Sequence, residues 1–436
     1  MAKAITKKIK INTPSGEKEI TLYDDYKTFS DYDNGSYIAV QTDTNETGYV
    51  YCNSTLPYNT NDHFATFVDK NGNLRYAYTQ EKLVAMYIFT TGKNKLPKIN
   101  GTDLTSASNK YKYSVKDTDN GDGTTIRRLY SNEIVNTLEF GGSTTTIGKD
   151  ILSIAYIDVS NINSIGYMFR NCVDLKAVNL TNFNKLKVTN MSTMFMDCKS
   201  LTSLNVSNFN TSQVTNMENM FENCNLLTSL DVSNFNTSNV TYMRRMFAGC
   251  KSLTSLNVSN FNTSKVTDMR EMFYGCKSLT SLNVSKFNTS KVTDMTSLFN
   301  GCNNLTSLDV SNFDTSRVTS MSSIFGNCYS LTSLDVSNFN TSQVTNMYAV
   351  FFGCNNLTSL DVSNFNTSKV TNISMMFYNC TSLTVLDIRN FSSANVTNCN
   401  NMFTNANSTC TVYVNKTKFT KTEAECSFKG KFTNVA

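Results

Sequence analysis

The most regular residues that could do chemistry are cysteines, which recur at a spacing of 26 residues. Thiols stacked in this way could hold metal ions or pair as disulfides, because neighbouring strands bring Cα atoms within the roughly 4.4–6.8 Å that a disulfide needs. Thiols in a parallel ladder point the same way, however, and cysteine packs as a small buried hydrophobe. We therefore predict buried free thiols, with occasional disulfides or a metal array as alternatives, at Cys172, Cys198, Cys224, Cys250, Cys276, Cys302, Cys328, Cys354 and Cys380. Cys410 and Cys426 lie beyond this series, and for them a disulfide and two free thiols both stay open.

A second series places Asn or Asp between two apolar residues of each repeat. Two carboxylates can act as general acid and general base only when their environments differ, and a repeat gives every copy the same environment. The chain also has a single histidine, His63, so the commonest general base is nearly missing. We predict no enzyme activity, no catalytic residue, no cofactor and no metal site. Instead we expect an outward-facing ladder that hydrogen-bonds to neighbouring Ser and Thr, with weak cation binding by the aspartates as the alternative: Asn205, Asp231, Asn257, Asn283, Asp309, Asp335, Asp361 and Asp387.

Basic residues form a third series at one turn of the repeat. This series could follow an anionic polymer such as a teichoic acid, a capsule or another acidic glycan, and a solvated turn face is the alternative. Its members are Lys187, Lys265, Lys291, Arg317 and Lys369, and Gln213, Asn239, Gln343 and Asn395 interrupt it.

Side chains that vary between copies carry more information about a target, since the scaffold does not dictate them. The position two residues before each cysteine is aromatic in three repeats, at Tyr274, Phe352 and Tyr378, and Tyr329 directly follows Cys328. Exposed aromatic side chains often anchor interfaces. We predict these four residues as recognition candidates, with packing between repeats as the alternative.

Two loop motifs resemble ligand sites and fail on spacing. GGSTTTIGKD has five residues between Gly142 and Gly148, and Asp150 stands where a phosphate loop needs Ser or Thr. DTDNGDGTT has Gly121 at position five and Arg128 at position twelve of a calcium loop, so we predict a hairpin turn there.

Length and charge exclude several classes of protein. With 39 basic and 34 acidic side chains in 436 residues, the net charge of +5 does not indicate nucleic acid or an anionic membrane as partner. The chain contains no apolar run of 18 residues, and its first 20 residues lack the apolar core of a secretory signal. We expect a soluble chain made without Sec export and without membrane insertion.

The elements that must position these residues come from a repeat of 26 residues, seen in Leu227 to Leu253 as LTSLDVSNFNTSNVTYMRRMFAGCKSL. Leu230 and Val232 alternate as in a short strand. The spacing of Val240, Met243, Met246 with Phe247, and Cys250 predicts a short helix that Thr241 could cap. The fold class is therefore an α/β repeat solenoid, similar to leucine-rich repeats, with one parallel strand and one helix per unit and a β-rich region before it. Stacking predicts an inward phenylalanine ladder at Phe169, Phe195, Phe221, Phe247, Phe273, Phe299, Phe325, Phe351, Phe377 and Phe403.

Four domains follow from these patterns: 1–100, a β-rich attachment domain; 101–148, a β-rich connector or N-terminal cap; 149–407, the array of ten units; and 408–436, a C-terminal cap. Alternation predicts hairpins around residues 9–22, 64–78 and 111–130. Lys82 to Phe89 fits either a short helix or a buried strand.

The consensus LxxLDVSNFNTSxVTNMxxMFxxC resembles the BspA-like leucine-rich repeats of bacterial surface adhesins, lipoproteins and gut bacteriophage proteins, and CTVYVNKTKF resembles their capping strand. This resemblance implies a right-handed solenoid that binds host surfaces, proteins or glycans, without catalytic residues. The start AKAITKKIKI resembles the openings of phage tail and fibre proteins.

Together these resemblances predict a phage virion protein of the tail or fibre, with a bacterial cell-surface or secreted BspA-like adhesin as the alternative. Expected partners are a bacterial surface glycan or protein receptor, other virion proteins through the N-terminal region, and further copies of the chain in a homo-oligomer.

Overall fold

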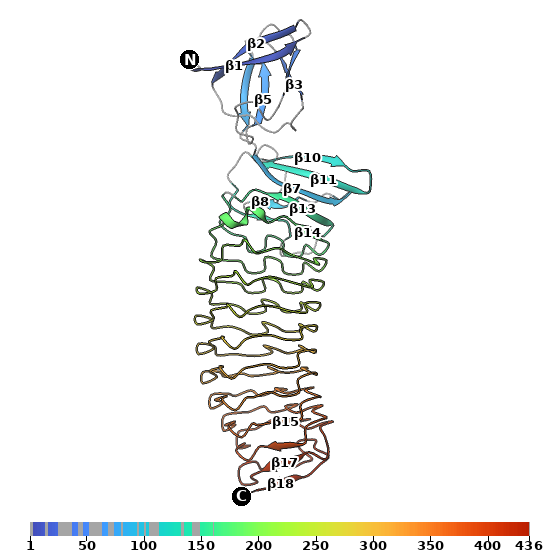
Figure 1. Cartoon of the computed structure of the whole chain (residues 1–436), viewed down its shortest axis with the longest axis vertical. Helices are drawn as coiled ribbons and strands as arrows, with labels where there is room; N and C mark the ends of the chain where they lie inside the picture. Colours follow the sequence, from blue (N-terminus) through green and yellow to red (C-terminus); the bar gives the residue numbers. More distant parts are fainter. Residues whose placement is uncertain are drawn as a thin grey trace.

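The structure is a computed structural model, and Figure 1 shows a long column of stacked coils that ends at the C-terminus. It describes residues 3–13, 16–24, 37–41, 47–51, 63–68, 74–79, 82–93, 96–99, 102–103, 113–131, 135–141, 149–159 and 161–435. The rejected phosphate-loop motif at 142–148 and the histidine side chain at 63 lie outside what is described.

The first strands pair as antiparallel hairpins. Their bounds are β1 (Lys3–Thr13), β2 (Gly16–Asp24), β3 (Tyr37–Gln41), β4 (Thr47–Tyr51), β5 (His63–Val68) and β6 (Leu74–Thr79). The order β2-β1-β4-β3 forms one sheet, and β5 pairs with β6. Ile11 lies opposite Lys18, and Phe64 lies opposite Tyr78. The hairpins predicted at 9–22 and 64–78 are therefore confirmed.

A five-stranded sheet with the order β10-β11-β7-β13-β14 precedes the array. Its strands are β7 (Lys82–Thr90), β10 (Tyr113–Asp119), β11 (Thr124–Ser131), β13 (Ile151–Ile157) and β14 (Ala177–Val178). The ambiguous segment 82–89 is thus a strand, and the hairpin predicted at 111–130 is confirmed. Its turn uses Gly121 and Gly123 at φ values of 75° and 83°, which favour glycine. The predicted boundaries at 100 and 148 stay predictions, and this sheet draws strands from both sides of each.

A smaller sheet and the aromatic core join the five-stranded sheet to the first coil. The small sheet orders as β12 (Leu138–Glu139), β8 (Lys98–Ile99) and β9 (Thr102–Asp103). The Tyr87 ring meets Phe140 edge-on at 5.3 Å between centroids, and Phe140 stacks on Phe169 at 5.9 Å. Phe169 is the first ring of the phenylalanine ladder, so no earlier coil covers it. Tyr87 and Phe140 take the place of that coil and cover the N-terminal end of the ladder.

Each repeat makes one coil, and successive coils pair in parallel. Columns of backbone hydrogen bonds join them, for example from Met243 N to Asp268 O (3.0 Å), Arg245 N to Arg270 O (2.9 Å) and Phe247 N to Met272 O (3.0 Å). The N–H groups between these bond within the coil, three residues back, as from Met246 N to Met243 O (3.2 Å).

The predicted helix in each unit is wrong. Within the segment 240–250, residues 244–249 form a run of turns, in which Arg245 and Gly249 have left-handed φ values of 53° and 71°. Left-handed residues interrupt an α-helix, and alternate N–H groups are already used by the next coil. Thr241 does not cap a helix but donates its Oγ1 hydrogen to Thr215 O of the preceding coil, at 3.1 Å.

The predicted strand is a regular strand only near the ends of the array. The C-terminal sheet orders as β15 (Ser359–Leu360), β16 (Val385–Asp387), β17 (Thr411–Val414) and β18 (Phe432–Asn434), all parallel. In the middle of the array, the backbone hydrogen bonds between the corresponding segments are long, such as that from Thr254 N to Thr228 O at 3.4 Å. A 3₁₀ helix, η2 (Thr181–Lys185), replaces one turn near the start of the array.

The core follows the inward positions of the repeat. Leu230, Val232, Met243 and Phe247 are buried, and the predicted phenylalanine ladder is confirmed, with successive ring centroids 5.1–6.0 Å apart in stacked arrangements. At the C-terminal end, Phe403 packs on rings of the last residues instead of on another coil. Burying a phenylalanine contributes about 1.5–3 kcal/mol, so these ladders carry much of the stability.

Candidate functional site

The cysteine ladder is structural. Its nine thiols are free and buried, as predicted, and each from Cys198 onward donates its Sγ hydrogen to the carbonyl of the phenylalanine 29 residues earlier, as in Cys250 to Phe221 O at 3.2 Å. Burial raises the pKa of Cys250 to about 12, which keeps it protonated and unreactive. Cys410 and Cys426 are also free thiols.

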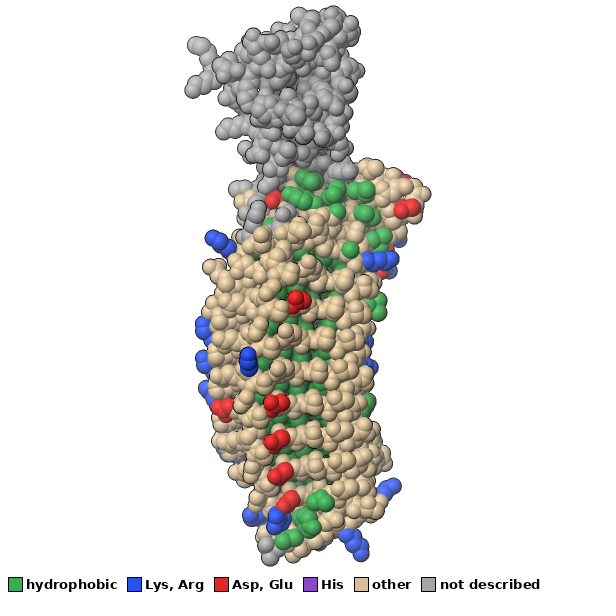
Figure 2. Space-filling view, in the orientation of Figure 1, with side chains coloured by type: hydrophobic (Ala, Val, Ile, Leu, Met, Phe, Trp, Pro, Cys, Tyr) green, Lys and Arg blue, Asp and Glu red, His purple; other side chains and the backbone are tan. Residues whose placement is uncertain are grey.

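The Asn/Asp series faces outward, and its members bond to a serine of their own turn, as predicted, except Asp387, which accepts from Arg389. Asp309 accepts hydrogen bonds from Ser311 N at 3.0 Å and Ser311 Oγ at 2.6 Å, which lower the pKa of Asp309. Asp231 likewise accepts from Ser233 N at 2.9 Å. Figure 2 shows a row of acidic side chains down one face of the column. Among the described residues, no group of three His, Cys, Asp or Glu side chains could hold a metal ion.

The basic series lies exposed along a turn edge, and Figure 2 shows Lys and Arg side chains along that side of the column. Two of its lysines bond to the amide one coil earlier: Lys265 Nζ to Asn239 Oδ1 at 2.7 Å, and Lys369 Nζ to Gln343 Oε1 at 2.8 Å. Lys291 and Arg317 are exposed in the same column of positions. This edge can present positive charge to an anionic partner, but each charge is exposed to water, which weakens its attraction for an anion.

Three of the four predicted aromatic residues lie on three successive coils, and a fourth ring, Tyr348, belongs to the same coil as Phe352. Phe352 stacks on Tyr378 with centroids 4.9 Å apart. The Tyr329 ring lies over Gly353, where an added Cβ would stand 3.0 Å from its Cε1 atom. We call Tyr329, Tyr348, Phe352 and Tyr378 the aromatic patch.

Sequence reasoning missed Tyr348, whose hydroxyl lies 3.4 Å from the Sδ atom of Met375 in the next coil. Its side chain is 37% exposed, and that of Tyr329 is 40% exposed. The signal that could have found Tyr348 is variation between copies, because the same position holds Ser322 and Ser374 in the flanking coils.

Tyr274 lies apart from the aromatic patch, three coils before Phe352. Its own coil and the two before it carry a charged patch, defined as Glu218, Glu222, Arg244, Arg245, Asp268, Arg270 and Glu271. The shortest pairs are Arg245 to Glu271 at 2.7 Å and Arg270 to Asp268 at 2.5 Å. Partial burial raises the pKa of Glu222, against the attraction of Arg245. The acidic and basic side chains of the patch nearly cancel in charge because they pair with one another. The patch is therefore better suited to stiffening the surface than to binding a charged ligand strongly.

Both patches occupy the same segment of the coil, residues 242–251 and their equivalents. The coils between them carry small polar residues there: Thr296, Asn300, Ser322 and Gly326. The scaffold therefore accepts large, charged or small side chains at these positions while its interior stays constant. Within the described part of the chain, no helix is long and apolar enough to cross a membrane.

A family model described as "Mycoplasma protein of unknown function, DUF285" matches the chain in four overlapping stretches, 140–254, 202–308, 245–333 and 298–416. Together they cover residues 140–416, which is more than half of the sequence. This match is consistent with the resemblance to BspA-like repeats. Searches of curated proteins and of solved structures gave no match.

Proposed function

The chain belongs to the DUF285 family of repeat proteins, and we propose that it is a non-enzymatic binding protein whose array recognises a cell-surface ligand. The observation that carries this proposal is the aromatic patch. Tyr348 is exposed on the same coil as the stacked Phe352, and Tyr329 is exposed on the coil before it, at positions where the other coils hold mostly charged, polar or small residues. The interior of the coil does not require rings there, which supports a use at the surface.

Aromatic side chains suit this use for two physical reasons. They bury 150–250 Å² each on contact and have only two side-chain torsions to fix, so binding costs little entropy. The surrounding Ser, Thr and Asn side chains supply hydrogen-bond donors and acceptors for hydroxyl groups. Flat rings set among such groups favour a bacterial surface glycan as ligand, and a protein receptor is the other outcome that a binding assay would reveal.

We propose that the chain acts in a phage virion, as part of the tail or a fibre, with its N-terminal strands held by other virion proteins. The resemblance of the first residues to tail and fibre openings supports this location. The alternative is a bacterial surface adhesin, supported by the BspA-like repeats. Mass spectrometry of purified particles and of the cell envelope would separate the two, because the chain should be enriched in only one.

The binding proposal is tested with the full chain and substitutions that other coils already contain. Tyr329→Asn, Tyr348→Ser and Tyr378→Asn copy Asn355, Ser322 and Asn300, so the coils should accommodate them. We expect the triple variant to bind whole bacteria at least about tenfold more weakly, which corresponds to about 1.4 kcal/mol. Tyr242→Asn, which copies Asn216, removes an exposed ring outside the patch and should bind like the unchanged protein. Equal binding by the triple variant would overturn the proposal.

A further inference from the structure

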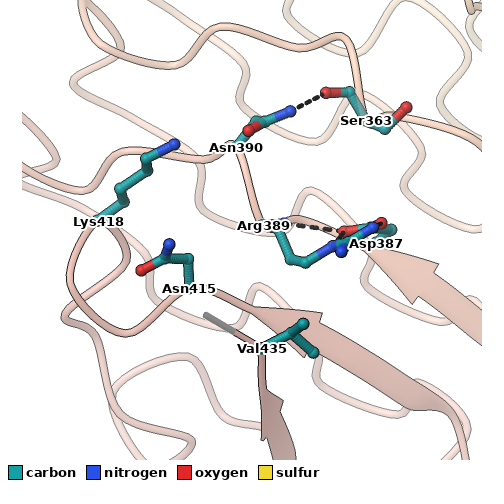
Figure 3. A pocket seen from close by; sticks show the side chains of 7 residues that line it. All are labelled: Ser363, Asp387, Arg389, Asn390, Asn415, Lys418 and Val435. Atoms are coloured by element: carbon teal, nitrogen blue, oxygen red, sulfur yellow. Dashed lines mark hydrogen bonds and ion pairs between the residues drawn. The ribbon is translucent and has the colours of Figure 1, made fainter.

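A pocket of about 320 Å³ lies between the last coils and the C-terminal cap, far along the column from the five-stranded sheet. Figure 3 shows the side chains around it: Lys418 and Asn415 lie on one side, and the guanidinium of Arg389 is turned toward Asp387. The lining residues are Ser363, Asp387, Arg389, Asn390, Asn415, Lys418 and Val435. A pocket of this size can accommodate a single sugar ring.

The two cations of the pocket are departures from the repeat. Position 389 is Ser in the preceding coils, at Ser311, Ser337 and Ser363. Position 418 corresponds to Ser392 and Asn366 in the two coils before it. Both changes replace a neutral residue by a cation, and both side chains line the same pocket, which the fold of the coil does not require.

The hydrogen bonds leave several donors available to a ligand. Asp387 holds the Nε and Nη2 groups of Arg389, at 3.0 and 2.7 Å, so the Nη1 edge remains. Lys418 Nζ has no hydrogen bond or ion pair among the described residues. Asn415 Oδ1 accepts from Thr417, which leaves its Nδ2 group. Asn390 Nδ2 donates to Ser363 O at 2.7 Å, which leaves its oxygen as an acceptor.

These charges specify the kind of anion. Two cations and one carboxylate give the lining a single net positive charge. Asp387 lines the pocket, and Asp361 stands one coil earlier in the acidic row. These two carboxylates repel a dense polyanion or a dianionic phosphate. A lone carboxylate experiences less of this repulsion, and it can accept a charge-assisted hydrogen bond from the Lys418 ammonium group. The amide groups and the Val435 side chain then face a neutral ring.

We propose that this pocket binds the carboxylate of an acidic sugar, such as a uronic acid at the end of a glycan chain. The Lys418 ammonium holds the carboxylate, and the Arg389 Nη1 group, Asn390 and Asn415 bind ring hydroxyls. The proposal rests on the proposed function for its choice of a glycan, whereas the anion site rests on the pocket alone.

Titration calorimetry of the full chain with sodium glucuronate, glucose and inorganic phosphate tests this inference. We expect glucuronate to bind at least about tenfold more tightly than glucose and more tightly than phosphate, and to weaken as salt is added. Arg389→Ser and Lys418→Asn should each weaken glucuronate binding about tenfold or more, because each removes a charged contact. Both substitutions introduce a residue that an earlier coil holds at the same position, so the coil should tolerate them. Circular dichroism of each variant checks that it is folded.

Lys369→Gln is the matched control, because it removes one positive charge from the basic series and copies Gln343. It should leave glucuronate affinity unchanged. Equal affinity for glucose, tighter binding of phosphate, or unchanged affinity in both pocket variants would overturn the pocket assignment. Loss of cell binding in the aromatic triple variant is a separate result, so a failed pocket and a failed recognition face are distinguishable.

Discussion

The inward positions of the array keep one residue type in nearly every coil, whereas the outward positions at 242–251 change from coil to coil. Phenylalanine stands at every member of the ladder that contains Phe247, but the position of Arg244 becomes Thr296, Ser322 and then Tyr348. An inward side chain packs against its own copies above and below, so one change disturbs three coils. An outward side chain meets mostly water. The array can therefore vary its surface without changing its fold.

The first way to break this comparison is to remove an inward ring. Phe299 is fully buried and stacks on Phe273 and Phe325 at centroid distances of 5.7 and 6.0 Å. Phe299→Ala should lower the free energy of unfolding by about 3–5 kcal/mol, through lost burial and an unfilled cavity. Urea denaturation followed by circular dichroism measures it, with Ser307→Ala on the exposed side as the control. A loss below about 1 kcal/mol would contradict a shared interior.

A buried hydroxyl should have the next largest effect. Thr263 Oγ1 donates to Asn288 O at 2.9 Å and accepts from Asn288 N at 2.7 Å. Thr263→Val leaves both backbone groups without a partner and should cost about 1–3 kcal/mol in the same assay. Thr267→Val is the comparison, because its exposed hydroxyl makes a single contact at 3.4 Å and water can replace it. Equal losses in the two variants would show that burial of the hydroxyl is irrelevant.

The charged patch tests an outward position in another way, because the contribution of Glu222 to stability should depend on pH. Burial raises the pKa of Glu222 in the folded protein. A raised folded pKa contributes stability below the unfolded pKa, and this contribution is lost as pH rises through the folded value. The unchanged protein should therefore lose stability relative to Glu222→Gln between pH 4 and pH 7. Melting temperatures of both proteins across this range measure the difference, and a gap of the opposite sign would count against a dominant burial effect.

The smallest effect on stability is expected at the aromatic patch. Tyr348→Ser copies the flanking Ser322 and Ser374, so it should change the free energy of unfolding by no more than about 0.5 kcal/mol. Denaturation of this variant beside Phe299→Ala compares the outside and the inside of the array directly. A loss of several kcal/mol would mean that the ring serves packing between coils.

Much of the coil could be predicted from the period alone. Repetition placed Phe247, Cys250, Leu230 and Val232 inside, because residues that recur at one spacing stack on their own copies. The helix could not be distinguished from turns in this way. A helix and a coil of turns both bring Met243 and Phe247 inward, and the deciding hydrogen bonds run to residues 25 positions away.

Only part of the candidate site could be predicted from the sequence, for a related reason. Tyr329, Phe352 and Tyr378 were chosen because they are aromatic and vary, and stacking brings them together. Tyr348 lies four positions before Phe352, at a position where no other coil has a ring, so no aromatic series pointed to it. Arg389 and Lys418 line one pocket because the register of the coils continues into the cap, but each cation stands at its position in one coil only, so no series pointed to them.

Hydroxyl-radical footprinting of the full chain with and without bound bacteria tests most directly whether the aromatic patch is the recognition surface. Our account predicts that bound cells slow the oxidation of Tyr329, Tyr348 and Tyr378 and leave that of the exposed Tyr242 unchanged. Protection confined to residues before 149, or equal at Tyr242 and in the patch, would contradict it.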